Sequence, residues 1–136
     1  YTLITMKKII SKCYKFNIHK IQNNNAFISV YENFKFKVKR FYILYNLKKN
    51  QYRNGHSHKK LEQIYICVSG GVKVYVENKY QKKYFVLNKP NQALFVSKKT
   101  WREIQSLEKG TVLCVLASLK FDEGDYIRSY SEFKKN

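Results

Sequence analysis

Proline and glycine are scarce in this chain, which has one proline and five glycines among its 136 residues. Aromatic residues are abundant by contrast and make up 16% of the chain. This balance excludes a collagen-like repeat, which needs frequent glycine, and a disordered chain, which has few aromatic residues. The 44% of hydrophobic residues is enough to enclose one sizeable core. We therefore expect a single domain over residues 1–136.

Long apolar runs are also missing. The longest, at residues 111–119, is far shorter than the ~18 residues that span a bilayer. Lys7 and Lys8 precede a short apolar stretch, as in a secretory leader, but polar residues from Ser11 to Lys15 interrupt it. We expect no membrane insertion, no secretion and a cytoplasmic protein.

Cysteine is limited to three widely separated positions, Cys13, Cys67 and Cys114. An odd number without paired spacing predicts neither a zinc site nor a disulfide framework. Cys67 and Cys114 lie inside apolar runs, where a thiol behaves as a small hydrophobic group. We expect reduced thiols without a chemical role.

Acidic residues are few, nine against 27 lysines and arginines, so the net charge is +18. Such a charge suggests nucleic-acid binding when the basic residues cluster. Here only four are arginines, and the lysines are spread from Lys7 to Lys135 without a dense stripe. We predict no nucleic-acid partner, although the positive field would attract a dianionic substrate.

Alternation of apolar and polar residues dominates the chain and is typical of half-buried strands. At residues 34–39, for example, the apolar residues take one face and three lysines the other. Turn signals recur at the spacing typical of an all-β sandwich or barrel. The tail at 122–136 has acidic residues first and lysines last, which favours a short C-terminal helix. The expected strands are 26–31, 34–39, 40–46, 61–68, 72–77, 80–87, 93–97, 101–106 and 111–117.

Two histidines, His56 and His58, form the most informative motif. Residues at i and i+2 of a strand face the same side, with Cα atoms about 6–7 Å apart, so both rings can act on one bound molecule. Alone, the pair is equally compatible with two exposed histidines near a loop.

The spacing from His56 and His58 to Gln63 and then Gly70 resembles the first motif of the cupin superfamily, whose third position is normally a metal-binding glutamate. A second cupin motif is recognisable at residues 91–106, with Arg102 at the place of the last metal-binding histidine. An amide is a poor metal ligand, and a guanidinium cannot lose its proton to coordinate a cation. We therefore expect a cupin without a metal, whose histidines act as acids and bases.

Residues 38–42 and 53–63 resemble the dTDP-6-deoxyhex-4-ulose 3,4-ketoisomerase family. Residues 72–74, Trp101, 115–118 and 122–133 are similar to that family as well, in the same order, so the resemblance covers roughly residues 26–134. It implies an all-β cupin, a double-stranded β-helix (jelly-roll) barrel, with its core at about 26–121 and a tail at 122–136. Residues 1–25 match poorly, and Asn23–Ala26 replaces an Asp-x-Arg-Gly turn of the family.

The resemblance implies an isomerase that moves the ketone of dTDP-4-keto-6-deoxyglucose from C4 to C3 through an enediol, without a cofactor. A separate aminotransferase would then form a 3-amino sugar for surface glycans. We expect His58 to remove the C3 proton and His56 to return a proton at C4, with the reverse assignment also open. Arg102 looks more like the members that give the gluco product than those that give the galacto product.

Further residues are expected to bind the substrate. Arg53 and Arg102 would stabilise the enediolate or hold the pyrophosphate, because a guanidinium offers paired donors. Lys59 is a candidate for a phosphate contact. By strand parity or by resemblance, Arg40, Tyr42 and Gln63 point toward the same cavity, although Tyr42 is equally compatible with an ordinary core aromatic.

Two other functions remain open: a cupin-type nucleotide-sugar epimerase, and a cupin that binds sugar nucleotides without turnover. Deuterium incorporated at C5 with the carbonyl still at C4 would indicate the epimerase. We expect a homodimer, because an N-terminal strand added to a neighbour's sheet would cover an exposed edge.

Overall fold

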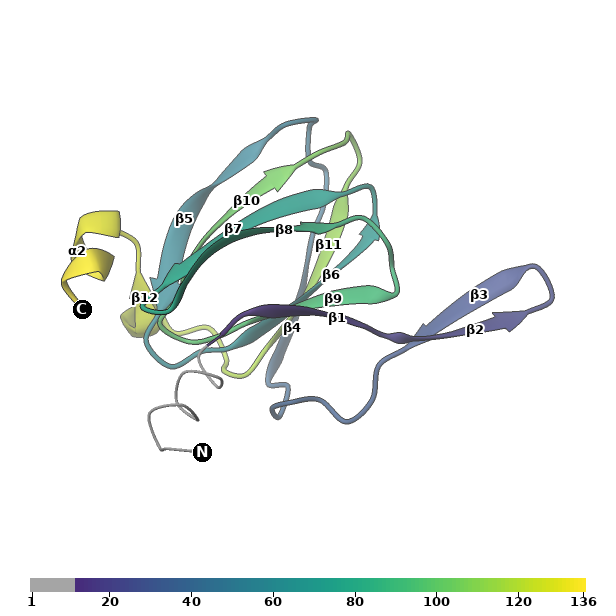
Figure 1. The fold of residues 1–136 in the computed structure, drawn as a ribbon, viewed down its shortest axis with the longest axis horizontal. Coiled ribbons are helices and arrows are strands. Elements are labelled where there is room, and N and C mark those ends of the chain that lie inside the picture. Colours follow the sequence, from purple (N-terminus) through teal and green to yellow (C-terminus); the bar gives the residue numbers. More distant parts are fainter. Residues whose placement is uncertain (1–11) are drawn as a thin grey trace.

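The computed structural model describes residues 12–136, and most of this range is antiparallel β-strand. Two five-stranded sheets face each other and curve into a barrel, while a separate hairpin projects from its side (Figure 1). In spatial order, the first sheet contains β1 (Tyr14–Asn17), β9 (Gln92–Val96), β6 (Gln63–Ser69), β11 (Val112–Ala117) and β4 (Arg40–Leu44). The second contains β12 (Tyr126–Ile127), β5 (Tyr52–His58), β10 (Trp101–Ser106), β7 (Val72–Asn78) and β8 (Gln81–Leu87). The hairpin consists of β2 (His19–Asn23) and β3 (Ala26–Val30).

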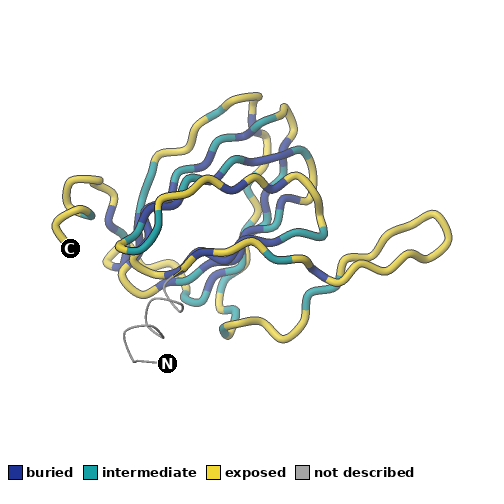
Figure 2. The backbone as a smooth tube through the Cα atoms, viewed as in Figure 1, coloured by how far each residue is buried: buried dark blue, intermediate teal, exposed yellow. Residues whose placement is uncertain are grey.

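The main core lies between the two sheets and follows from the alternation along their strands. On β7, Val72, Val74 and Val76 are fully buried, whereas Lys73 and Tyr75 between them are partly exposed. Burying one such side chain stabilises the fold by about 1.5–3 kcal/mol. The inner faces of both sheets are accordingly buried (Figure 2).

A second, smaller core covers part of the outer face of the first sheet. Ile64 and Phe95 are fully buried there, and Phe16, Tyr31 and Phe36 pack over them. The chain between β3 and β4 therefore acts as a cover for this sheet.

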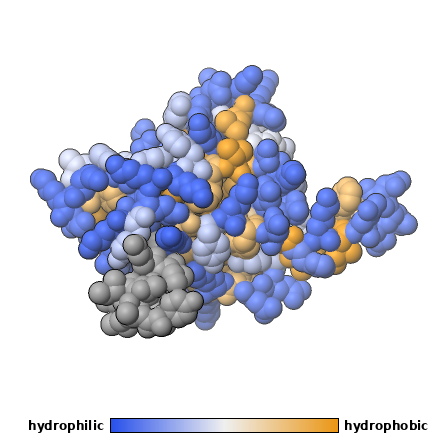
Figure 3. Space-filling model, in the orientation of Figure 1, coloured by the Kyte–Doolittle hydropathy of each residue, from blue (hydrophilic) through white to orange (hydrophobic). Residues whose placement is uncertain are grey.

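The hairpin, which we call the arm, is exposed along both strands (Figure 2). Ile21, Phe27 and Ile28 are its exposed large apolar side chains, and Phe27 retains 61% of its accessible surface. Apolar side chains are visible along the arm in Figure 3. An isolated two-stranded hairpin is only marginally stable in water, so this apolar surface is unusual for a free element.

The C-terminal helix α2 (Tyr130–Lys135) packs against the outer side of the second sheet. Tyr130 and Phe133 contact the Trp101 ring, with centroid distances of 5.3 and 5.8 Å. The buried Glu77 accepts hydrogen bonds from the Tyr130 hydroxyl and from Lys134 Nζ. Trp101 is thus a packing residue between strand and helix.

The all-β cupin fold with a short C-terminal helix is confirmed. Eight of the nine expected strands are present, with ends shifted by no more than two residues. The strand expected at 34–39 is wrong, because this segment pairs with no neighbouring strand. Its alternation has a different cause: Phe36 packs on the first sheet, Lys37 is exposed, and the exposed Lys35 places its Nζ over the Phe95 ring of that sheet. The helix is also shorter than expected, since a 3-10 turn, η1 (Glu123–Asp125), and β12 occupy the start of the tail.

No helix within residues 12–136 is long and apolar enough to cross a membrane. The expectation about a leader segment falls mostly on residues 1–11, which lie outside the described residues.

Candidate active site

A cavity of about 540 Å³ opens between the two sheets. Its wall includes residues from β4, β5, β6, β10, β11 and β12, so both sheets contribute to it. All four arginines of the chain line this cavity, and neither a lysine nor an acidic residue does so among the described residues. They are Arg40 on β4, Arg53 on β5, Arg102 on β10 and Arg128 just after β12. Guanidinium groups present planar paired donors to phosphate and carboxylate, so the cavity is suited to an anion.

Arg102 is fully buried and has no carboxylate partner among residues 12–136. Its Nη1 donates to Gln63 Oε1 at 2.5 Å, and its Nη2 donates to the Thr100 carbonyl at 2.9 Å. Its Nε is buried without a partner in the described chain. A buried cation without a counter-ion is costly, so this position favours an anionic guest.

Gln63 links this guanidinium to two tyrosines. Its Oε1 also accepts a hydrogen bond from Tyr65 at 2.9 Å, and its Nε2 donates to the Tyr42 hydroxyl at 3.1 Å. Because Tyr42 accepts this bond, its own O–H remains available to donate into the cavity. Burial raises the pKa of Tyr42, which keeps this donor protonated.

The two histidines lie on β5 beside Arg102, which pairs with His56 across the β5–β10 ladder. His56 lines the cavity, whereas His58 is fully buried beside it, with ring centroids 5.0 Å apart. The Tyr126 ring packs on both imidazoles, at centroid distances of 5.4 Å from His56 and 4.2 Å from His58. Strand pairing brings Tyr126 to this position, because β12 pairs Tyr126 with His58 of β5.

Both imidazoles are held in the neutral form. Burial, and then the positive charge of Arg102, lower the pKa of His56 to about 3 and that of His58 to about 2. A hydrogen bond with the Asn54 backbone opposes the shift at His56 only in part. Near pH 7 each ring therefore has one nitrogen with a lone pair that can accept a proton.

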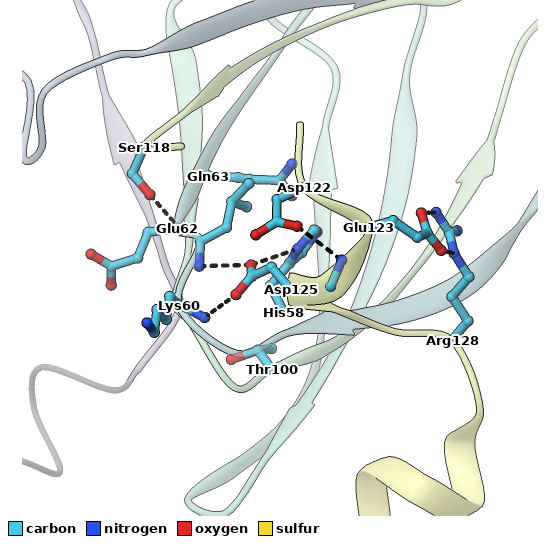
Figure 4. Close-up of polar contacts among 12 residues, drawn as sticks. His58, Lys60, Glu62, Gln63, Thr100, Ser118, Asp122, Glu123, Asp125 and Arg128 are labelled. Carbon is cyan, nitrogen blue, oxygen red and sulfur yellow. Dashed lines mark hydrogen bonds and ion pairs between the residues drawn. The ribbon is translucent and has the colours of Figure 1, made fainter. Parts of the chain in front are cut away.

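Behind His58, the tail of the chain contributes a buried carboxylate. Asp125 Oδ2 lies 3.2 Å from His58 Nδ1, as drawn in Figure 4. Farther out, Arg128 binds Glu123 through Nε and Nη2 at 2.7 and 2.9 Å and stacks over the Tyr126 ring at 4.1 Å. Tyr126 and Arg128 thus line the cavity, while Asp125 lies behind His58.

The residues of this site do not fit a metal ion, the guest that many cupins hold. Among residues 12–136 there is no group of three or more His, Cys, Asp or Glu side chains that could hold one. Only two imidazoles are available, and the buried Arg102 guanidinium lies beside them. A guanidinium repels a cation and cannot coordinate it.

The structure brings most of the expected site residues together. Arg40, Tyr42, Arg53, His56 and Arg102 line the cavity. Gln63 and His58 lie just outside its wall, where they contact lining residues.

Lys59 is the expected residue that the structure does not bring to the cavity. It is exposed, and its backbone N–H donates to the Asp125 carbonyl at 3.0 Å. The reason is its place in the chain, since β5 ends at His58 and Lys59 lies in the bend that follows, where its side chain is exposed.

Several further residues of the site were missed from the sequence, among them Tyr65, Asp125, Tyr126 and Arg128. Tyr126 and Arg128 alternate along the tail, and this short period-two signal was available in the sequence. Asp125 is separated from His58 by 67 positions, so only the pairing of β12 with β5 brings it there.

A two-sheet antiparallel barrel with paired histidines on an inner strand defines this protein as a cupin, and four arginines line its cavity. The family model described as "FdtA: WxcM-like, C-terminal" matches residues 5–136, and the chain belongs to this family.

Named relatives agree with this assignment. A curated TDP-4-oxo-6-deoxy-alpha-D-glucose-3,4-oxoisomerase from Aneurinibacillus thermoaerophilus is 34% identical over 117 residues, which cover 85% of this chain and 84% of the relative. The TDP-quinovose 3,4-ketoisomerase WlaRB from Campylobacter jejuni is 35% identical, with a TM-score of 0.86 over 93% of this chain and all of that one. The sugar 3,4-ketoisomerase QdtA from Thermoanaerobacterium thermosaccharolyticum, solved in complex with TDP, is 33% identical, with a TM-score of 0.84 over 90% and 92% of the two chains. The chain is an isomerase, and the family resemblance seen in its sequence is confirmed.

Proposed function

We propose that this protein is a TDP-sugar 3,4-ketoisomerase that converts TDP-4-keto-6-deoxyglucose to the 3-keto sugar. The observation that carries the proposal is the cavity itself, which is lined by four arginines and the neutral His56, with the neutral His58 buried beside His56. The arginines suit the pyrophosphate of a sugar nucleotide, and the histidines suit proton transfer on the sugar. The names of the relatives support the same substrate class.

In the proposed mechanism, His56 removes the proton from C3. The electrons of that C–H bond form a C3–C4 double bond, and negative charge collects on O4. Protonation of O4 and C4, with loss of the proton on O3, then gives the 3-ketone. The buried Arg102, and Tyr42 with its free O–H, are suited to stabilise the charge on the enediolate oxygens.

The two histidines take the reverse of the roles first expected from the sequence. His56 lines the cavity and is therefore supported as the group that reaches the sugar, whereas His58 is fully buried beside it. We assign His58 to the shuttling of protons to and from the site.

Two finer points of the reaction belong to the same proposal. A product of gluco configuration is supported by the 35% identity to a relative named for TDP-quinovose, the 6-deoxy sugar of that configuration. The ketone at C3 is the electrophile that transamination requires, so an aminotransferase would consume the product to form a 3-amino-3,6-dideoxy sugar for surface glycans.

We further propose that the protein is a homodimer of the cytoplasm. The exposed apolar arm supports a second copy as partner, because its surface matches an interface better than a solvated hairpin. The cysteines Cys13, Cys67 and Cys114 are unpaired, which supports a reducing compartment.

The proposal is tested by incubating the protein with TDP-4-keto-6-deoxyglucose in heavy water and following the sugar by NMR. We expect the 3-keto isomer and exchange at C3, both unaffected by exhaustive chelation of metals. His56→Asn should slow both by about 100-fold or more, because a positioned acid or base contributes about 10²–10⁴-fold. His19→Asn on the arm is the matched control.

Four outcomes would contradict the proposal in different ways. Undiminished exchange at C3 in His56→Asn would remove His56 as the base. Deuterium at C5 with the carbonyl still at C4 would indicate the epimerase, and binding without any exchange would indicate a non-catalytic cupin. A stoichiometric, tightly bound metal whose removal abolishes turnover would refute a metal-free site.

A further inference from the structure

Asp125 is a buried carboxylate that the proposed mechanism does not use. Only 6% of its surface is exposed, and it lies at the end of η1, next to the strand pairing between β12 and β5. Its backbone is fixed as well, since its carbonyl accepts from the Lys59 amide at 3.0 Å and its N–H donates to the Asp122 carbonyl.

The carboxylate oxygens have three donors around them. Oδ1 accepts from the Lys60 amide at 2.9 Å, and Oδ2 accepts from the Leu61 amide at 3.2 Å. Oδ2 also lies 3.2 Å from His58 Nδ1 (Figure 4). Two backbone amides thus hold the carboxylate in one orientation, and that orientation places it at a single nitrogen of the imidazole.

We propose that Asp125 is a positioning residue that holds His58 in the Nδ1–H tautomer, so that Nε2 presents the lone pair that takes up a proton. A carboxylate can only accept a hydrogen bond, so the nitrogen that faces it must carry the hydrogen. His58 Nε2 is buried and has no partner among residues 12–136, so no described group competes for it.

The carboxylate also compensates for an unfavourable environment. Burial and the nearby Arg102 both oppose a positive charge on His58. Arg128, Arg40 and His56 act in the same direction, and Asp125 is the acidic residue in contact with the ring. When a proton reaches Nε2, the adjacent carboxylate stabilises the imidazolium that forms, as in a Ser-His-Asp triad.

The tautomer is measurable without substrate. In protein labelled with 15N-histidine, long-range 1H–15N spectra distinguish a ring nitrogen that carries hydrogen from one that does not. We expect wild-type His58 to be Nδ1–H, and Asp125→Asn to convert it at least in part to Nε2–H, because the amide can donate to Nδ1. Asp122→Asn is the matched control: it lies in the same segment, caps Gly124 and does not touch His58.

The kinetic consequence rests on the proposed function. For Asp125→Asn we expect kcat to fall roughly 100-fold with KM near the wild-type value, because a wrong tautomer costs turnover and Asp125 does not line the cavity. Asp122→Asn should keep both constants. A purely structural role would instead lower the Tm and leave the spectrum of the folded fraction unchanged.

Several results would overturn the inference. Wild-type His58 in the Nε2–H form would do so at once, even if Asp125→Asn does not fold. A folded Asp125→Asn protein with the wild-type tautomer and kcat would do so as well. If the tautomer changes as expected but the wild-type protein does not isomerise the sugar, the proposed function fails while the role of Asp125 at His58 is supported.

Discussion

At the scale of single residues, the site depends on titratable groups whose charge the fold controls. Arg102 keeps a positive charge in a fully buried position, and burial keeps His56 and His58 neutral beside it. This combination places a positive charge beside two imidazoles that can accept protons.

The neutral histidines have a consequence for stability. The pKa of His56 is about 3 and that of His58 about 2, against an ordinary value near 6.5. Below pH 6.5 the unfolded chain therefore binds protons that the folded chain does not, and the free energy of unfolding falls as the pH falls toward 3. Each histidine contributes at most about 1.4 kcal/mol per pH unit.

Urea unfolding at pH 7, 6 and 5 checks this prediction. The stability of His58→Asn should fall less steeply with pH than that of His19→Asn, which removes an exposed histidine of the arm. If the free energy of unfolding falls equally steeply with pH in both variants, His58 takes up its proton over the same pH range in the folded and the unfolded protein, and the prediction is wrong.

The sequence was sufficient for part of this chemistry. His56, His58, Gln63 and Arg102 stand within recognisable motifs, so their shared location was predictable. Asp125 was not, because a single aspartate in a polar tail carries no local pattern that distinguishes a buried carboxylate from a solvated one.

At the scale of elements, β5 is constrained from both sides. Its inner face carries the histidines, and its outer face packs on Trp101, which in turn contacts α2. A Cβ at Gly55 would overlap the indole ring of Trp101, so close packing requires glycine at this position.

Gly55→Ala is therefore expected to destabilise the protein by about 1–3 kcal/mol, as overpacking does. Displacement of Trp101 should also loosen α2, which hydrogen exchange of the helix amides would detect. Gly71→Ala is the control, because its Cβ would meet only ordinary contacts, 3.5 Å from Asn88 Cβ and Leu107 Cδ1. If urea unfolding gives the same stability for both variants, Trp101 does not constrain β5.

The prediction of strands from the sequence failed where pairing with a neighbouring strand, rather than the alternation of apolar residues, decides whether a segment is a strand. Residues 34–39 alternate as a strand does, but they belong to no sheet, and their backbone reaches a strand through the Lys39 N–H, which donates to the Ala117 carbonyl of β11. Conversely, β1 and β12 are short, and only their partners β9 and β5 make them strands. The longer strands of the barrel have enough apolar alternation to be predicted without knowledge of their neighbours.

At the scale of the whole molecule, the arm is the feature that one chain does not explain. Its apolar residues cover nothing in the body, and β4, a strand at the edge of the first sheet, carries the exposed Phe41 and Ile43. Both surfaces would be covered in the homodimer that we propose.

Sedimentation equilibrium provides the test. We expect wild-type protein to be a dimer, and Phe27→Lys to raise the dissociation constant roughly 10- to 100-fold, which corresponds to the loss of about 1.5–3 kcal/mol of apolar burial. Tyr84→Lys on β8 replaces an equally exposed aromatic residue of the body and should leave the dimer intact. A monomeric wild-type protein would exclude the arm as a dimer contact.

The segregation of basic side chains has a practical consequence. Since every arginine of the chain lines the cavity while the lysines of residues 12–136 lie elsewhere, a dicarbonyl reagent selective for guanidinium groups would label this one compartment. Mass spectrometry of the modified peptides would then report occupancy of the cavity directly, without any engineered probe.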